Sequence, residues 1–156
     1  MSASTAPTGA GSSGDQGRIR SYDVKRLITA LGVVLVVGCG TPVPTVPEDE
    51  PVSYSAHLEP LVIAHCLGCH EAKEPKAKLV LEEGTGYEQL AGRRSVQQPE
   101  MALVEPGDPE NSYLWLKLQH TATDGKGMPR TLTGVKKLRP AELELYRRWI
   151  VEGALP

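Results

Sequence analysis

Phenylalanine is absent from this 156-residue sequence, and aromatic residues make up only 4% of it. A domain with so few large aromatic side chains has little with which to fill a core, and this composition permits a buried cofactor to supply apolar volume. Long basic runs are also absent, and the formal net charge is -2, which argues against nucleic acid as a partner. Sixteen glycines and 13 prolines indicate loops and linkers rather than long sheets.

Residues 1–38 are typical of a secretory signal peptide. After a polar, low-complexity start, four basic residues between Arg18 and Arg26 precede an apolar run of 11 residues, Leu27 to Val37. Signal peptides contain apolar runs of about 7–15 residues, whereas a membrane-spanning helix needs about 20. We therefore expect this protein to be exported, with removal of residues 1–38.

The apolar run ends in Val36-Val37-Gly38-Cys39, which resembles the lipobox of bacterial lipoproteins. In those proteins the chain is cut before the cysteine and the thiol is diacylated, which implies a lipid anchor on Cys39. The alternative is an ordinary signal peptide with an incidental cysteine. Residues 39–52 contain four prolines, which favour an extended tether. The prediction is a bacterial lipoprotein, anchored to a membrane on the periplasmic or outer face.

The strongest signal in the sequence is Cys66-Leu67-Gly68-Cys69-His70. C-x-x-C-H is the attachment sequence for c-type haem. Two cysteines three positions apart on a helical turn point to one side, so both thiols can add to vinyl groups of one porphyrin. His70 follows directly and is predicted to bind the iron as the proximal ligand. Gly68 leaves room for the haem close to the backbone.

Other uses of these cysteines fit the sequence less well. A zinc site needs about four ligands, and with Cys39 assigned to lipid no further cysteine remains for one. A thioredoxin-like site would start a helix in a βαβ unit, a pattern that is missing here. A disulfide between Cys66 and Cys69 would leave His70 unexplained. We therefore predict one covalent haem c.

The candidates for a second axial ligand are Met101, Met128, His57, His65 and His120. Met128 is preferred because neighbouring glycines let its loop approach the haem and Pro129 stiffens that loop. Met101 is read as a packing residue, and the two histidines before Cys66 would have to reach the wrong face. His120 is expected to be a solvated helix cap. An open position or His120 remains the alternative.

Residues 53–156 resemble the small cytochrome c domains of myxobacterial and planctomycete secreted proteins. The matching segments are Tyr54 to His70, Leu79 to Leu90, Val104 to Leu114, Met128-Pro129 and Trp149 to Ala154. In that family the histidine of C-x-x-C-H and the methionine before proline are the axial ligands, which implies His70 and Met128 here. The resemblance implies an all-α, cytochrome c-like fold with three to five helices around one covalent haem.

Helices are expected in three places. The first begins near Ser53 or Ser55 and leads into Cys66. The second starts at residue 111 or 112 and runs to about Gln119, and the third covers residues 140–151 and ends before Gly153.

Several side chains have expected positions around these helices. Trp149 is predicted to pack in the core against the first helix. The predicted walls of the haem pocket are Leu79, Leu81, Tyr87 and Leu90. The lysines between residues 73 and 78 alternate with glutamates, which indicates a solvated loop or, alternatively, a docking face.

His/Met ligation leaves no open position on the iron, which favours electron transfer over catalysis. The predicted function is an extracytoplasmic one-electron carrier that is not an enzyme. Its expected partners are redox proteins, such as a dehydrogenase, an oxidase or another cytochrome, together with the membrane through the anchor. The alternatives are a haem sensor or peroxidase-like protein with a labile sixth ligand, a domain dedicated to one enzyme, and a non-haem lipoprotein adaptor.

Overall fold

The computed structural model describes residues 42–156. The signal peptide predicted for residues 1–38 and the lipidation predicted at Cys39 lie outside the described residues. Within residues 42–156, no helix is both long enough and apolar enough to cross a membrane.

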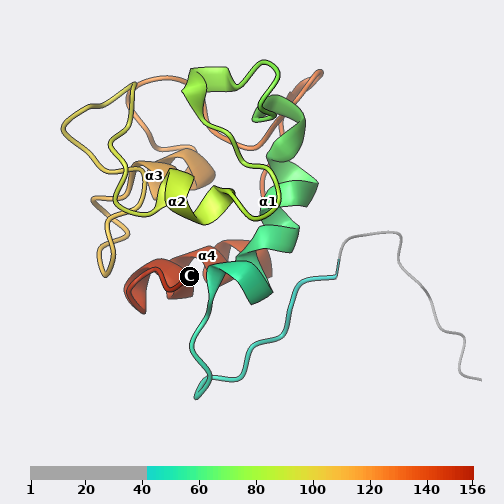
Figure 1. Cartoon of the computed structure of the whole chain (residues 1–156), viewed down its shortest axis with the longest axis vertical. Coiled ribbons are helices and arrows are strands. Elements are labelled where there is room, and N and C mark those ends of the chain that lie inside the picture. Colours follow the sequence, from blue (N-terminus) through green and yellow to red (C-terminus); the bar gives the residue numbers. More distant parts are fainter. Residues whose placement is uncertain (1–41) are drawn as a thin grey trace, which may run out of the picture. The chain divides into compact units, whose positions relative to one another are not determined.

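Residues 42–156 contain four α-helices, joined by turns and irregular segments (Figure 1). They are α1 (Glu59–His65), α2 (Gly86–Leu90), α3 (Tyr113–Gln119) and α4 (Pro140–Val151). A π-helical turn, Tyr54–Leu58, leads into α1, and short 3-10 turns cover Leu67–Cys69 and Lys76–Lys78. The helices predicted over residues 112–119 and 140–151 are therefore confirmed, and the number of α-helices falls within the predicted three to five.

A small antiparallel sheet departs from the all-α prediction. Its strands are β1 (Arg130–Thr131) and β2 (Gly134–Val135), which pair Arg130 with Val135 and Thr131 with Gly134. Gly134 closes the turn with a φ of 147°, in a region that only glycine enters readily. The β-branched residues of this stretch favour extended backbone, but two-residue strands are too short for a periodic signal in the sequence.

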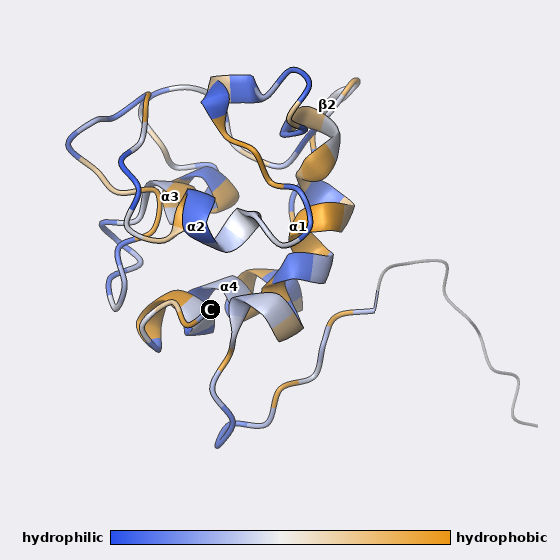
Figure 2. Cartoon of the chain, in the orientation of Figure 1, coloured by the Kyte–Doolittle hydropathy of each residue, from blue (hydrophilic) through white to orange (hydrophobic). Residues whose placement is uncertain are grey.

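The core forms where α4 packs against the turn that leads into α1. Trp149 and Ile150 are fully buried, and the Trp149 ring lies 5.6 Å from the ring of Tyr54. Leu58, Leu61 and Leu145 complete this core, and Figure 2 shows apolar stretches on α1 and at one end of α4. The predicted core position of Trp149 is thus confirmed.

Tyr87, predicted to line the haem pocket, belongs to this core instead. Its ring lies 6.0 Å from the ring of Tyr54. Gly86 permits this approach, because any side chain at that position would collide with the Tyr54 hydroxyl. The sequence pattern predicted that Tyr87 is buried, but it could not distinguish the core around Trp149 from the haem pocket.

The segment before the domain is fastened to the end of α4. The Arg148 guanidinium donates hydrogen bonds to the carbonyls of Val46, Pro47 and Glu50 over 2.9–3.2 Å. The backbone N–H of Val52 donates to Glu152 at 2.6 Å, and Val52 is fully buried. Residues 46–52 of the predicted tether (residues 39–52) therefore pack against the domain. The Arg148 side chain is 98 to 102 positions away in sequence from the three carbonyls that it binds. The proline content of the segment therefore could not predict these contacts.

Candidate cofactor site

The Cys66–His70 segment continues from the C-terminal end of α1. The predicted capping residue Ser53 accepts a hydrogen bond from the Ala56 N–H, and Pro60 stands in the first turn of α1, where its missing N–H is harmless. The helix then tightens at Cys66 into the 3-10 turn Leu67–Cys69. His70 closes this turn, because its N–H donates to the Leu67 carbonyl at 2.8 Å.

The two cysteines of this segment are free thiols that are not joined as a disulfide. Cys66 is half-buried on the wall of a cavity, whereas Cys69 is exposed. Burial, with a smaller effect from Cys69, raises the pKa of the Cys66 thiol to about 12. Gly68 has no atom of another residue within 4 Å of the place that a side chain would occupy. The backbone is therefore open beside Gly68, as predicted for a flat group lying against it.

The His70 imidazole is buried and has a fixed orientation. Its Nδ1 donates a hydrogen bond to the Leu79 carbonyl at 3.1 Å, because a carbonyl can only accept. That leaves Nε2 as the nitrogen with a free lone pair. Burial lowers the pKa of His70, against a smaller upward effect of hydrogen bonds to the backbone of Leu79 and Lys76. Metal binding requires the neutral form, which this environment favours.

An apolar cavity of about 90 Å³ lies beside His70. Leucines make up much of its wall: Leu79, Leu81, Leu90, Leu103, Leu114 and Leu118. Three of these, at positions 79, 81 and 90, were predicted as haem-pocket walls and are confirmed as cavity walls.

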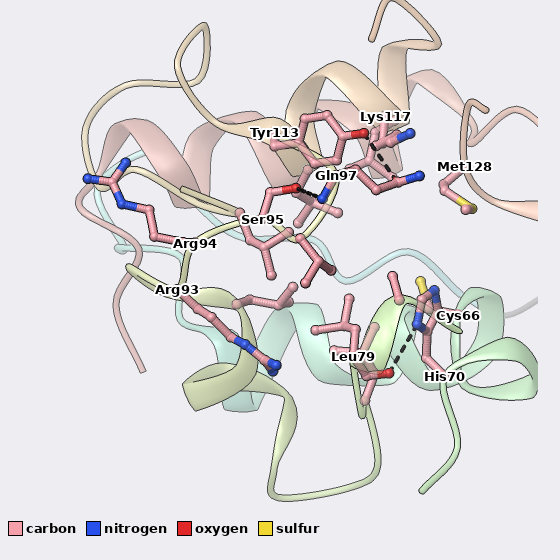
Figure 3. Close-up of a pocket in the computed structure, with 17 residues that line it drawn as sticks. Cys66, His70, Leu79, Arg93, Arg94, Ser95, Gln97, Tyr113, Lys117 and Met128 are labelled. Carbon is pink, nitrogen blue, oxygen red and sulfur yellow. Dashed lines mark hydrogen bonds between the residues drawn. The ribbon is translucent and has the colours of Figure 1, made fainter. Parts of the chain in front are cut away.

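Met128 faces the same cavity from the other side (Figure 3). Its loop is fastened to α3 on both sides of the residue. The Met128 N–H donates to the Lys117 carbonyl at 2.8 Å, and the Met128 carbonyl accepts from His120 Nε2 at 2.9 Å. His120 has a left-handed backbone with φ of 66° at the end of α3, which directs its ring to this contact.

The other candidate ligands are used elsewhere. His57 Nδ1 accepts the N–H of Ser53 at 3.0 Å, and His65 lies 3.0 Å from the Glu142 carboxylate. His120 is the C-cap of α3, as expected, but its ring is half-buried and holds the backbone of Met128. Neither Met101 nor His120 is among the residues that line the cavity. Of the five candidates, Met128 is the one that lines this cavity together with His70.

A buried cation occupies the polar part of the cavity wall. Lys117 is only 4% exposed, and its Nζ donates to the Asp124 carbonyl at 2.6 Å and lies 4.7 Å from the centre of the Tyr113 ring. Within residues 42–156 it forms no ion pair with a carboxylate. Burial lowers the pKa of the Lys117 ammonium, against a smaller upward effect of the Asp124 charge. A buried cation held mainly by neutral groups suits an additional anion beside it. Sequence reasoning missed Lys117, although it stands beside Leu118 in an apolar helix.

Neighbouring polar groups extend this end of the cavity. The Tyr113 hydroxyl lies 3.1 Å from Gln97 Oε1 and donates to the Asp124 carbonyl at 2.7 Å. Arg93 and Arg94 also line the cavity and donate to backbone carbonyls. The leucine-rich wall with buried and partly exposed cations in it thus suits an apolar molecule that carries carboxylates.

A second buried polar cluster joins α4 to the residue before Cys66. Glu142 is 1% exposed and receives hydrogen bonds from His65 Nε2 at 3.0 Å and from the Arg139 guanidinium and N–H at 2.7 Å each. Burial raises the pKa of Glu142, but these hydrogen bonds prevail and lower it to about 2. The cluster fixes the C-terminal end of α1 and hence the position of Cys66.

Comparison with known proteins agrees with this geometry. Residues 66–130 match the family model described as planctomycete cytochrome C. The match includes the C-x-x-C-H sequence and ends just after Met128-Pro129, which supports a small c-type cytochrome domain in this chain. Cytochrome c domains bind haem c covalently and carry electrons, and this chain is accordingly a haem-binding electron carrier in general terms. Searches of curated proteins and of solved structures returned no match.

Proposed function

We propose that this protein is an extracytoplasmic one-electron carrier with a single covalent haem c and a cytochrome c-like fold. The observation that carries the proposal is the shared cavity of His70 and Met128, with Cys66 on its wall. A nitrogen and a thioether that face one apolar cavity are the ligand types of electron-transferring haem proteins.

The residues divide the work of holding the cofactor. Cys66 and Cys69 would form the two thioether bonds, and His70 Nε2 and the Met128 sulfur would ligate the iron. Lys117 would pair with a carboxylate of the porphyrin. The donor set and the buried lysine both fit haem, which would supply an iron couple that accepts and gives single electrons.

The protein controls this couple in two ways. Leucine side chains exclude water from the cavity, which favours the iron state of lower charge, and a thioether ligand acts in the same direction. Two protein ligands would leave no iron position for a substrate, which is why we propose transfer rather than catalysis. Hydrogen bonds from Met128 to α3 keep the sulfur in place and oppose its loss.

We further propose that the protein is exported and anchored through diacylated Cys39. The signal-like residues 1–38 and the lipobox-like sequence before Cys39 support this part. Attachment of haem c outside the cytoplasm is consistent with export. The partner is a dehydrogenase, an oxidase or another cytochrome on the same side of the membrane.

The experiment is a spectroelectrochemical titration of the protein produced with a haem c attachment system. We expect one haem per chain in a pyridine haemochrome assay, a single one-electron transition, and no binding of carbon monoxide to the reduced protein. A chain without haem refutes the carrier. A haem protein that binds carbon monoxide stoichiometrically has a labile sixth ligand and refutes the His/Met assignment.

A further inference from the structure

Positive charge is concentrated in one segment of an otherwise acidic chain. Residues 126–137 contain Lys126, Arg130, Lys136 and Lys137 and no acidic residue, while the whole chain has a net charge of -2. All four basic side chains are exposed. We call residues 126–137 the basic hairpin segment, because they include β1 and β2.

The charges of this segment are uncompensated within the described part of the chain. Arg147 and Arg148 on α4 pair with Glu144 and Glu152, but no ion pair involves a basic residue of the basic hairpin segment. Its positive potential therefore extends into solvent, over about 10 Å at 0.1 M salt.

The basic hairpin segment also borders the cofactor site. A recess beside the cavity is lined by Cys69 and His70 on one side and by Met128, Arg130 and Leu132 on the other. Leu132 is fully exposed and Val135 is 52% exposed. Near the β2 label in Figure 2, the hairpin projects from the domain. An apolar hairpin tip surrounded by basic residues thus lies next to the two cysteines at which we propose the thioether bonds.

We propose that the basic hairpin segment is the docking surface for a redox protein that presents carboxylates around an apolar centre. This inference rests on the proposed function, since it assigns the partner of the same haem. In transient interfaces, apolar contacts usually lie at the centre and complementary charges lie at the rim. Basic charge at the rim steers an acidic partner and raises its association rate.

The position of the N-terminal segment favours a protein partner over a membrane surface. The basic hairpin segment leads into the start of α4, whereas Arg148 and Glu152 hold residues 46–52 at its other end. A helix of 12 residues is about 18 Å long, and Figure 1 shows these two segments on opposite sides of the domain. A chain anchored from its N-terminal end therefore presents the hairpin away from the lipid.

The test compares oxidation of the reduced holoprotein by ferricyanide and by tris(phenanthroline)cobalt(III) in a stopped-flow instrument. The protein gives one electron to each oxidant, so ferricyanide becomes ferrocyanide and the cobalt complex becomes cobalt(II), with no proton transferred. Between about 0.01 M and 1 M salt, where screening lengths fall from about 30 Å to about 3 Å, we expect the ferricyanide rate to fall and the cobalt rate to rise. The opposite signs, which follow the net negative charge, overturn the proposal.

Two variants with the same change in net charge separate the effect of charge in the basic hairpin segment from the effect of the total charge. Lys136→Glu and Arg147→Glu change the net charge equally, but only Lys136 lies in the basic hairpin segment. Lys136→Glu is expected to slow ferricyanide oxidation at low salt several-fold more than Arg147→Glu does. Equal effects of the two variants overturn the proposal, while haem content and the one-electron transition test the proposed function separately.

Two macromolecular probes decide the class of partner. Poly-L-glutamate should slow ferricyanide oxidation of the wild type at low salt and have less effect on Lys136→Glu. Phosphatidylglycerol vesicles should not sediment the protein made without Cys39. Vesicle binding that Lys136→Glu abolishes, or equal inhibition of both proteins by polyglutamate, overturns docking of an acidic protein at this surface.

Discussion

Replacement of Glu142 by glutamine tests how α4 holds the haem-attachment segment. The Glu142 carboxylate is 1% exposed and is hydrogen-bonded to His65, which precedes Cys66, and to Arg139. Glutamine keeps the size of the side chain but removes its charge. We expect Glu142→Gln to destabilise the domain at neutral pH without removing the haem.

The pKa of Glu142 determines how much stability the domain should lose in Glu142→Gln. Burial raises this pKa, yet hydrogen bonds from Arg139 and His65 lower it overall from 4.5 to about 2. A fall of about 2.5 corresponds to about 3 kcal/mol of stability contributed by the ionised form. Because the pKa is lower in the folded state, this contribution is complete above pH 4.5 and is lost as the pH falls towards 2.

The assay is denaturant unfolding of the holoprotein from pH 2 to pH 7. The free energy of unfolding of Glu142→Gln should lie about 3 kcal/mol below that of the wild type at pH 7, and the gap should close towards pH 2. Glu144→Gln is the control, because Glu144 lies on the same helix with its side chain 58% exposed, and it should change stability by less than about 0.5 kcal/mol. Parallel pH curves for wild type and Glu142→Gln would refute the reasoning.

Three further predictions concern the cofactor and the anchor. Met128→Ala should lower the reduction potential, remove the weak sulfur-to-iron absorption band of the oxidised protein and let carbon monoxide bind the reduced form, whereas Met101→Ala should leave the spectrum unchanged; the reverse pattern makes Met101 the ligand. Lys117→Met should lower the unfolding free energy of the holoprotein by about 3 kcal/mol, since it removes the buried cation that we propose pairs with a carboxylate of the haem. Lys126→Met should change it by less than about 0.5 kcal/mol, and equal effects contradict a role for Lys117 in anion binding. Cys39→Ser should turn a detergent-extracted protein into a soluble or uncleaved one, and a wild type that is already soluble with its N-terminus beyond Cys39 contradicts the anchor.

Local sequence patterns predicted three of the four α-helices in the described residues, whereas α2 was not predicted. Ser112 and Pro140 mark helix starts, and the structure begins α3 and α4 at residues 113 and 140. The burial of Trp149 also followed from helical spacing. These features depend on neighbours within a few positions along the chain, which is the range over which periodicity and capping carry information.

Long-range contacts escaped prediction. Tyr87 has the sequence neighbours of a pocket residue, yet it packs on Tyr54, 33 positions earlier. Arg148 holds carbonyls of residues 46–50, and the distant pair Glu142 and His65 joins two helices. From the sequence a lysine at position 117 is expected at the surface, but in the structure Lys117 is buried. In each case tertiary packing, rather than local spacing, decides what the side chain contacts.

The attachment of haem through Cys66 and Cys69 is tested most directly by the mass of the denatured protein. We predict that wild type and Cys39→Ser, produced with a haem c attachment system, each carry the mass of one haem that survives denaturation and stains on a denaturing gel. Cys66→Ala combined with Cys69→Ala should carry none. A wild type without the added mass, or a double variant that keeps it, would contradict covalent haem at these two cysteines.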